Sequence, residues 1–257
     1  MTAELDLALE CARRAADIVA RGFASDVGAE FKGTVDPVTA IDRAAEDAVR
    51  TLLAAEAPDD RILGEERGGG HWAEGRVWIV DPLDGTVNFI HRLPQVAVSI
   101  GLWEDGKPVA GVVRDALGGE VFAAESGAGA TLDGSPVETS TTSELSGALV
   151  ATGFPYDRQQ RAGELAGTLA AVLSRVQGIR RIGSAALDIC WVAAGRFDAY
   201  WESGLEPWDA AAGVLVATEA GCRVTDLDGS PHLLDAPAIL CSNGVLHDDM
   251  LGILGSA

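Results

Sequence analysis

The sequence predicts a layered α/β fold, because two amphipathic helices open the chain, an antiparallel meander follows, and helices then alternate with strands. Its 257 residues are 47% hydrophobic and 23% charged, which is typical of globular proteins and excludes disordered and collagen-like chains. This length fits one domain, residues 1–257, with a softer division into halves 1–145 and 146–257 near a Ser/Thr-rich stretch.

The two opening helices are predicted from the spacing of their apolar residues. Leucine, alanine and valine recur every three or four positions between residues 5 and 19, and Gly22 marks a stop. A second apolar stripe runs from Thr39 to Ala57 and ends before Pro58. We interpret both segments as packing helices.

The predicted strands begin after residue 60. Arg61 to Leu63 and Val77 to Val80 form short buried strands, each followed directly by acidic residues. Residues 96–132 predict an antiparallel meander with glycine-containing turns. The remaining chain predicts strands at 148–152, 197–201, 222–225 and 238–241, and helices at 158–175, 184–194 and 208–220.

Composition and charge exclude several classes of function. The chain has 39 acidic and 19 basic residues, and the resulting net charge of −20 would repel a nucleic acid. No stretch reaches the ~18 unbroken apolar residues of a membrane helix. The acidic N-terminal residues differ from a secretion signal, so we expect a cytoplasmic protein. Four widely separated cysteines disfavour a zinc site and a disulfide scaffold.

The segment with the most candidate functional residues follows the second predicted strand. That strand delivers Asp81 to its end, and Pro82 prevents its continuation. Asp84, Gly85 and Thr86 can then start a helix whose free backbone N–H groups suit a phosphate. The two carboxylates can also face one cation. In the alternative interpretation, Asp84 only caps the helix and Asp-Pro only forms a turn.

Further acidic residues surround this motif in the sequence. Glu65 and Glu66 follow the first strand, Asp42 lies at the start of the second helix, and Asp209 opens a later helix. Taken singly, each has a structural explanation as a solvated side chain, a cap or a first-turn acid. If they converge, carboxylates about 4 Å apart repel by ~4 kcal/mol at an effective dielectric near 20, and bound cations relieve this repulsion. Hard oxygen ligands favour Mg²⁺, Mn²⁺ or Ca²⁺.

Four motifs occur together along the chain. The run Asp-Pro-Leu-Asp-Gly-Thr-Val-Asn-Phe-Ile-His-Arg-Leu-Pro at 81–94 is preceded by Asp-Pro-Val-Thr-Ala-Ile-Asp at 36–42 and Gly-Glu-Glu at 64–66, and followed by Trp-Asp-Ala-Ala-Ala-Gly at 208–213. In order and spacing these motifs resemble the inositol monophosphatase family, over nearly the whole chain. The resemblance implies an α-β-α-β-α sandwich and a Mg²⁺-dependent, lithium-sensitive phosphatase.

The resemblance also implies a set of metal ligands. Glu65, Asp81 and the backbone carbonyl of Leu83 would hold one Mg²⁺. Asp81, Asp84 and Asp209 would hold a second ion, and Glu65 would contribute through water to a weaker third. Two or three ions per site are therefore expected, and Mn²⁺ can replace Mg²⁺.

Catalytic and phosphate-binding residues follow from the same resemblance. Glu65 and Thr86 would orient and deprotonate the attacking water, with Asp42 behind Thr86. The backbone N–H groups of Gly85 and Thr86 would bind the phosphoryl oxygens. Lys32 would add positive charge nearby.

Substrate recognition is expected from a second stretch, again by resemblance. Ala185 through its backbone N–H, and Glu202 and Glu206 through their carboxylates, would contact a polyol. Asp84 and Asp209 would contribute to the same contacts. Glu206 departs from the animal enzymes, which carry His at the matching position.

The leading functional hypothesis is hydrolysis of inositol 1-phosphate or a similar small polyol phosphate. Histidinol phosphate, whose ammonium could pair with Glu202 or Glu206, and fructose 1,6-bisphosphate are alternatives with the same chemistry. A non-catalytic interaction module that keeps the fold is an alternative of another class. Relatives are commonly homodimers and the meander at 96–113 offers apolar surface, so we expect a homodimer, without a nucleic-acid or membrane partner.

Overall fold

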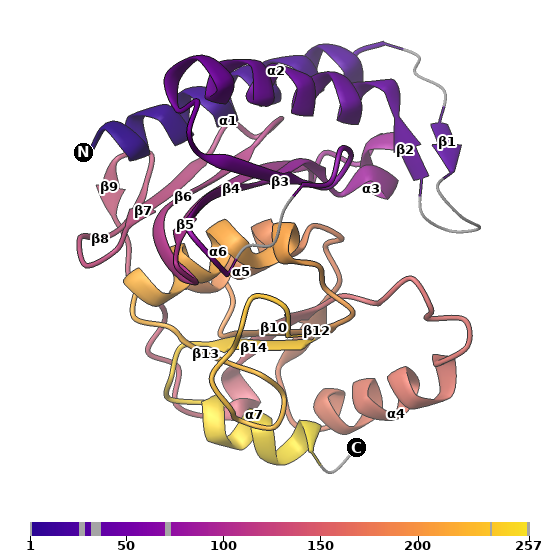
Figure 1. Ribbon diagram of the computed structural model, residues 1–257. Helices are drawn as coiled ribbons and strands as arrows, with labels where there is room; N and C mark the ends of the chain where they lie inside the picture. Colours follow the sequence, from indigo (N-terminus) through magenta and orange to yellow (C-terminus); the bar gives the residue numbers. More distant parts are fainter. Residues whose placement is uncertain (1, 26–28, 32–36, 70–72, 237, 256–257) are drawn as a thin grey trace.

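The computed structural model describes residues 2–25, 29–31, 37–69, 73–236 and 238–255. These residues form five layers in Figure 1: a pair of helices, a sheet, a second pair of helices, a second sheet and a third pair of helices. This order confirms the predicted α/β class and the α-β-α-β-α sandwich. One apolar core lies between the two sheets, and two others lie on their outer faces.

The first layer consists of α1 (Ala3–Phe23) and α2 (Ala40–Glu56), which match the two predicted amphipathic helices. The hydroxyl of Thr2 caps α1 and that of Thr39 caps α2, each by accepting a backbone N–H of the first turn. Their apolar faces cover the first sheet. A two-stranded sheet precedes α2 and consists of β1 (Ala29–Phe31) and β2 (Pro37–Thr39).

The first sheet has the strand order β3-β4-β5-β6-β7-β8-β9 within the described residues. β3 and β4 pair in parallel, and the later strands pair antiparallel, which confirms the predicted meander. The strands are β3 (Arg61–Gly64), β4 (Arg76–Asp84), β5 (Ala97–Glu104), β6 (Lys107–Asp115), β7 (Val121–Glu125), β8 (Gly129–Leu132) and β9 (Ser135–Pro136).

The end of β4 differs from the sequence prediction. Pro82 does not stop the strand after Asp81; the strand continues to Asp84, with a shift in pairing register between the two aspartates. Proline is tolerated at such an irregularity because the local ladder does not require its missing N–H. Gly85 then leads into the short helix α3 (Thr86–Ile90).

The second sheet has the strand order β11-β10-β12-β14-β13 within the described residues, and α4 and α7 cover its outer face. The sequence does not predict β11 or α7, because three and eight residues carry little periodicity. The elements are β10 (Leu149–Thr152), β11 (Gly178–Arg180), β12 (Ala199–Ser203), β13 (Arg223–Thr225), β14 (Ala238–Ser242), α4 (Ala162–Leu173), α7 (His247–Leu254) and the 3₁₀ helix Leu145–Gly147.

The central layer consists of α5 (Ala185–Ala193) and α6 (Pro207–Glu219), which lie between the two sheets (Figure 1). Both helices follow the Ser/Thr-rich stretch in the sequence, yet they pack against strands from before it. Residues 139–146 therefore separate the strands of the two sheets, while the central core joins both halves of the chain.

The close approach of α6 to the first sheet depends on two glycines. Gly101 of β5 and Gly111 of β6 are paired across the sheet. A Cβ at Gly101 would lie 3.1 Å from the Cβ of Ala211, and a Cβ at Gly111 would lie 2.9 Å from the carbonyl oxygen of Ala212. Larger residues at these positions would push α6 away from the sheet.

The meander offers no free apolar face for a partner. Residues 97–103 of β5 and 110–113 of β6 are buried, because α1 and α6 cover opposite faces of these strands. The predicted use of this segment as a dimer interface is therefore wrong, and the homodimer stays a prediction. All four cysteines are buried and unbonded, as expected. No helix among the described residues has the length and apolar character needed to cross a membrane.

Replacing Gly111 by alanine tests the packing of α6. We expect Gly111→Ala to lower the free energy of unfolding by about 1–3 kcal/mol, because the new methyl group collides with the backbone of α6. Urea unfolding measures this change.

Gly163→Ala is the matched control, because a Cβ at this position in α4 meets nothing within 4 Å. We expect this variant to be neutral or to gain up to ~1 kcal/mol from the higher helix propensity of alanine. Equal destabilisation by the two substitutions would contradict the proposed packing constraint.

Candidate active site

One pocket of about 330 Å³ collects most of the candidate site residues. It lies where the ends of β4 and β12 meet the first residues of α3, α5 and α6. Nine of the eleven predicted site residues line it: Glu65, Asp81, Leu83, Asp84, Gly85, Thr86, Ala185, Glu202 and Asp209. The fold therefore brings together residues that are up to 144 positions apart in the sequence (209 − 65).

Asp81 reaches the pocket through the alternation of side chains along β4. Val77 and Ile79 belong to the core shared with α6, whereas Trp78 and Val80 belong to the core under α1 and α2. Because side chains two positions apart lie on the same face of a strand, Asp81 follows Val77 and Ile79 toward α6. Its Oδ1 accepts the backbone N–H of Leu83 at 3.0 Å.

Asp84 is held by the N-terminal end of α5. Its Oδ2 accepts the hydroxyl of Ser184 at 2.5 Å and the backbone N–H of Ala186 at 2.8 Å. The side chain of Asn88 donates to the carbonyl oxygens of Gln95 and Ile182, at 2.8 and 2.9 Å, and so ties α3 to the same segment. These contacts fix the position of Asp84 relative to α5.

Position 85 requires glycine. It has φ of 93°, in the left-handed region, and a Cβ there would lie 2.9 Å from the carbonyl oxygen of Gln95. Both conditions exclude a larger residue at the start of α3 without strain.

Thr86 of α3 and Asp42 of α2 are linked by a hydrogen bond. The Thr86 hydroxyl lies 3.1 Å from Asp42 Oδ1 and 3.2 Å from the carbonyl oxygen of Leu83, and its single proton can be donated to either oxygen. Asp42 does not line the pocket itself; it is fully buried, and its Oδ2 accepts the backbone N–H of Thr39 at 2.9 Å. Burial raises the pKa of Asp42, while the donors from Thr39 oppose the shift.

Asp209 lies in the first turn of α6. The Ser99 hydroxyl donates to the carbonyl oxygen of Trp208 at 3.2 Å, which anchors this turn to β5. Oδ2 of Asp209 accepts the backbone N–H of Glu206 at 2.8 Å. Glu206 itself is exposed and does not line the pocket, so its predicted contact with substrate is not supported. As the residue before α6, it projects outside the pocket that Asp209 enters.

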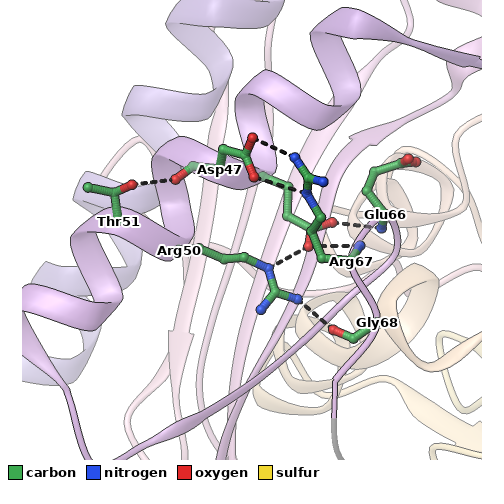
Figure 2. A network of polar contacts seen from close by, with 7 residues as sticks. Asp47, Arg50, Thr51, Glu66, Arg67 and Gly68 are labelled. Carbon is green, nitrogen blue, oxygen red and sulfur yellow. Dashed lines mark hydrogen bonds and ion pairs between the residues drawn. The ribbon is translucent and has the colours of Figure 1, made fainter.

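Glu65 lies in a turn that Glu46 holds in place. Glu46 is fully buried in α2, and its carboxylate accepts the backbone N–H groups of Glu66 and Arg67 at 2.7 and 3.1 Å. Arg50 donates to the same carboxylate at 2.6 Å and also bonds the carbonyl oxygen of Gly68. Figure 2 shows this turn against α2. Sequence reasoning missed Glu46, although an acid on the apolar face of an amphipathic helix is a recognisable signal.

The carboxylates of the pocket raise one another's pKa. Burial raises the pKa of Asp81 well above its usual range, and the charges of Glu65, Asp84 and Asp209 raise it further. Burial also raises the pKa of Asp209, with Asp84 and Glu65 adding to the effect. Burial raises the pKa of Asp84, which the Ser184 and Ala186 donors oppose. The four carboxylates therefore lie within electrostatic range of one another.

The side chains of this pocket are not arranged as a complete metal site. Within the described ranges, no three or more His, Cys, Asp or Glu side chains are already arranged to hold a metal ion. The chemistry of the donors nevertheless suits a hard divalent cation, because carboxylate and carbonyl oxygens are the ligands that Mg²⁺ prefers.

Glu202 lines another part of the pocket, on β12. It accepts the hydroxyl of Tyr200, and its carboxylate lies against Gly153, where a Cβ would come within 2.3 Å of all three carboxyl atoms. Glycine at position 153 therefore makes room for this carboxylate. Burial raises the pKa of Glu202 to about 7, while Tyr200 and Arg181 oppose the shift.

Comparison with known proteins identifies the group to which the chain is related. Residues 2–256 match the group described as the inositol monophosphatase family. The chain belongs to this family.

Its relatives in the inositol monophosphatase family carry two kinds of name. The chain is 41% identical over 258 residues to inositol-1-monophosphatase of Caulobacter vibrioides, covering 97% of this chain and 100% of that protein. It is 39% identical over 242 residues to Nus factor SuhB of Escherichia coli K12, covering 93% and 91%. The crystal structure of extragenic suppressor protein SuhB from Bartonella henselae matches with a TM-score of 0.93 at 36% identity, covering 98% of each chain.

The motifs that resemble the inositol monophosphatase family do not contain every residue that lines the pocket. Ser184, Asp188 and Arg181 also line it, and sequence reasoning assigned them no role. Ser184 could have been found as the N-cap of α5, whereas nothing in the sequence separates Asp188 from an ordinary first-turn acid. Lys32 and Asp36 lie outside the described residues.

A substitution at Glu46 tests how the Glu65 turn is held. We expect Glu46→Gln to lower the free energy of unfolding by about 1–3 kcal/mol, because one buried donor then faces an amide NH₂ instead of an oxygen. Urea unfolding measures the change.

The control is Asp47→Asn on the same helix. Asp47 pairs with Arg67 at 2.7 Å, and both side chains are about half exposed, at 54% and 47%. We expect a change below ~1 kcal/mol, as for other surface ion pairs. A loss at Asp47 as large as that at Glu46 would contradict the role given to the buried carboxylate.

The raised pKa of Glu202 predicts a pH dependence of stability in buffer without divalent ions. A carboxyl with a folded-state pKa of about 7 against an ordinary value of 4.5 binds more protons in the folded protein. Its stabilising contribution is present below pH 4.5 and is lost as the pH rises through 7. The loss is on the order of 3 kcal/mol.

Glu202→Gln is expected to remove this part of the pH dependence, which urea unfolding from pH 4.5 to 8 measures. If the wild-type protein and the variant lose stability in parallel over this range, the raised pKa is contradicted. The other carboxylates of the pocket remain in both proteins; because the charge of Glu202 also raises the pKa of Asp188 and Asp209, the difference reports Glu202 together with these couplings.

Proposed function

We propose that the protein is a Mg²⁺-dependent phosphomonoesterase acting on inositol 1-phosphate or a similar small polyol phosphate. The observation that carries this proposal is the gathering of the family's carboxylate, threonine and glycine positions around one pocket. A pocket of about 330 Å³ is within the range of small-molecule sites, which is ~300–1,000 Å³.

Five oxygen donors would hold the metal ions in this proposal: the carboxylates of Glu65, Asp81, Asp84 and Asp209 and the carbonyl of Leu83. The raised pKa values of Asp81, Asp84 and Asp209 support the assignment, because carboxylates that repel one another in a buried pocket are stabilised by divalent charge. When bound, Mg²⁺ supplies an activated water and stabilises the leaving oxygen.

Thr86 and Glu65 would orient the attacking water. When the Thr86 proton is donated to Asp42 or to the carbonyl of Leu83, the lone pairs of its oxygen are free to accept a hydrogen bond from water. Glu65 would take up the proton that the water releases. The backbone N–H groups of Gly85 and Thr86 would bind the phosphoryl oxygens as negative charge moves onto them.

The organic part of the substrate would lie beside Glu202 and the backbone N–H of Ala185, which line the same pocket. A carboxylate acceptor suits the hydroxyl groups of a polyol. Histidinol phosphate and fructose 1,6-bisphosphate remain the alternative substrates. A panel of these three phosphates, compared by kcat/KM with and without Mg²⁺, separates them, and a preference above a hundredfold for histidinol phosphate would overturn our first choice.

A role in protein interaction is the second candidate, because the chain is similar to a protein named Nus factor SuhB as well as to inositol-1-monophosphatase. The same assay decides between the two. Phosphate release that requires Mg²⁺ and is abolished by a chelator supports the enzyme, and no release from any phosphate in the panel supports the interaction role. Inhibition by lithium and light scattering for a homodimer test the two remaining predictions.

Asp84→Asn tests the proposed chemistry. We expect kcat/KM to fall by about a thousandfold, equivalent to ~4 kcal/mol of transition-state stabilisation, because the neutral amide removes a ligand for Mg²⁺. Steady-state kinetics with inositol 1-phosphate measures the effect.

The fold should survive this substitution. The amide oxygen can still accept from Ser184 and Ala186, and the variant loses a charge whose burial is unfavourable. Urea unfolding without divalent ions should therefore show equal or higher stability. Asp47→Asn, on an exposed face of α2, should keep full activity, and undiminished activity of Asp84→Asn would contradict the proposal.

A further inference from the structure

The pocket contains a carboxyl group for which neither the metal ligands nor the phosphate site has a use. Asp188 lies on α5, lines the pocket, and is only 1% exposed. Its nearest charged neighbours include Glu202 and Arg181, which line the same region. In the proposed function, this part of the pocket would face the organic half of the substrate rather than its phosphate.

Asp188 differs from the other buried carboxylates in its hydrogen bonding. Among the described residues its Oδ1 has no hydrogen-bond partner and is enclosed by the surrounding packing. Glu202 accepts the hydroxyl of Tyr200, and Asp84 accepts from Ser184. A buried polar atom without a partner costs about 1–3 kcal/mol, so its retention in a pocket indicates that a ligand provides the partner.

The charged groups that act on Asp188 are Glu202, Asp84 and Arg181. Burial raises the pKa of Asp188 well above its usual range, and the charges of Glu202 and Asp84 raise it further, whereas Arg181 opposes the shift. A carboxyl group accepts a hydrogen bond from a hydroxyl group in either protonation state, and it also donates one when it keeps its proton.

We propose that Asp188 is a specificity-determining residue: when substrate binds, its carboxyl group turns into the pocket and forms a hydrogen bond with a hydroxyl group of the substrate, next to the hydroxyl that Glu202 contacts. This inference rests on the proposed phosphatase function. It narrows the substrate class to phosphates of compounds with at least two neighbouring hydroxyl groups. A phosphate ester without hydroxyl groups gains nothing from Asp188.

The experiment compares two substrates in the presence of Mg²⁺: inositol 1-phosphate, and 4-nitrophenyl phosphate, which has no hydroxyl group. Asp188→Leu replaces the carboxyl by an apolar group of the same branched shape, although a larger one. We expect kcat/KM for inositol 1-phosphate to fall by about tenfold to a hundredfold, mainly through KM, because the substrate hydroxyl is left without its partner. The kcat/KM for 4-nitrophenyl phosphate should change less than threefold.

Asp188→Asn is the conservative variant. Its amide still donates and accepts, so we expect kcat/KM for inositol 1-phosphate to stay within about fivefold of the wild-type value. A merely structural role would affect both substrates alike and would not be restored by asparagine. If Asp188→Leu does not fold, as judged by circular dichroism, Asp188→Ala is assayed in its place under the same expectations.

The outcomes separate this inference from the proposed function. If the wild-type protein hydrolyses neither substrate, the phosphatase assignment fails. If the wild-type protein is active and the apolar variant affects both substrates equally, or neither, the role of Asp188 is overturned. A selective loss of activity toward histidinol phosphate, with inositol 1-phosphate unaffected, would also overturn it, because the partner would then be a cation.

Discussion

The repulsion among buried carboxylates in one pocket is the constraint on which the rest of the structure depends. Burial raises the pKa values of Asp81, Asp84 and Asp209, and for Asp81 and Asp209 the charges of neighbouring carboxylates raise them further. Such groups do not come together by themselves, since each pair at contact distance repels by several kcal/mol. Apolar packing elsewhere holds them: β4 lies between two cores, and α6 is enclosed between the two sheets.

A layer of hydrogen bonds then sets the direction of the individual groups. Ser184 orients Asp84, Glu46 holds the turn that carries Glu65, and Asp42 lies behind Thr86. Each of these contacts joins segments that are at least 20 residues apart in the sequence. The site is therefore fixed by the tertiary structure and not by the local conformation of any one motif, which is the arrangement that precise positioning of reacting groups requires.

The two ends of the pocket have different chemistry. At one end, carboxylates and backbone N–H groups of the 81–86 segment suit divalent ions and a phosphoryl group. At the other end, Glu202 and Asp188 carry carboxyl groups, which can hydrogen-bond to hydroxyls. The two ends are built from different elements, so residues at one end can change without moving those at the other.

The sequence by itself determined the fold class, the two opening helices, the meander and the candidate carboxylates, because periodicity and motif spacing are local properties of the chain. It also supplied the family, through motifs in a recognisable order. Only the tertiary structure decided that Glu206 stays outside the pocket and that the meander is covered on both faces. It also decided that Glu46 and Asp188 are buried acids rather than solvated side chains on a helix surface. The physical reason is that the sequence predicts on which side of its own helix or strand a residue lies. Whether that residue is buried, and which groups it hydrogen-bonds, depends on which other element packs against that side.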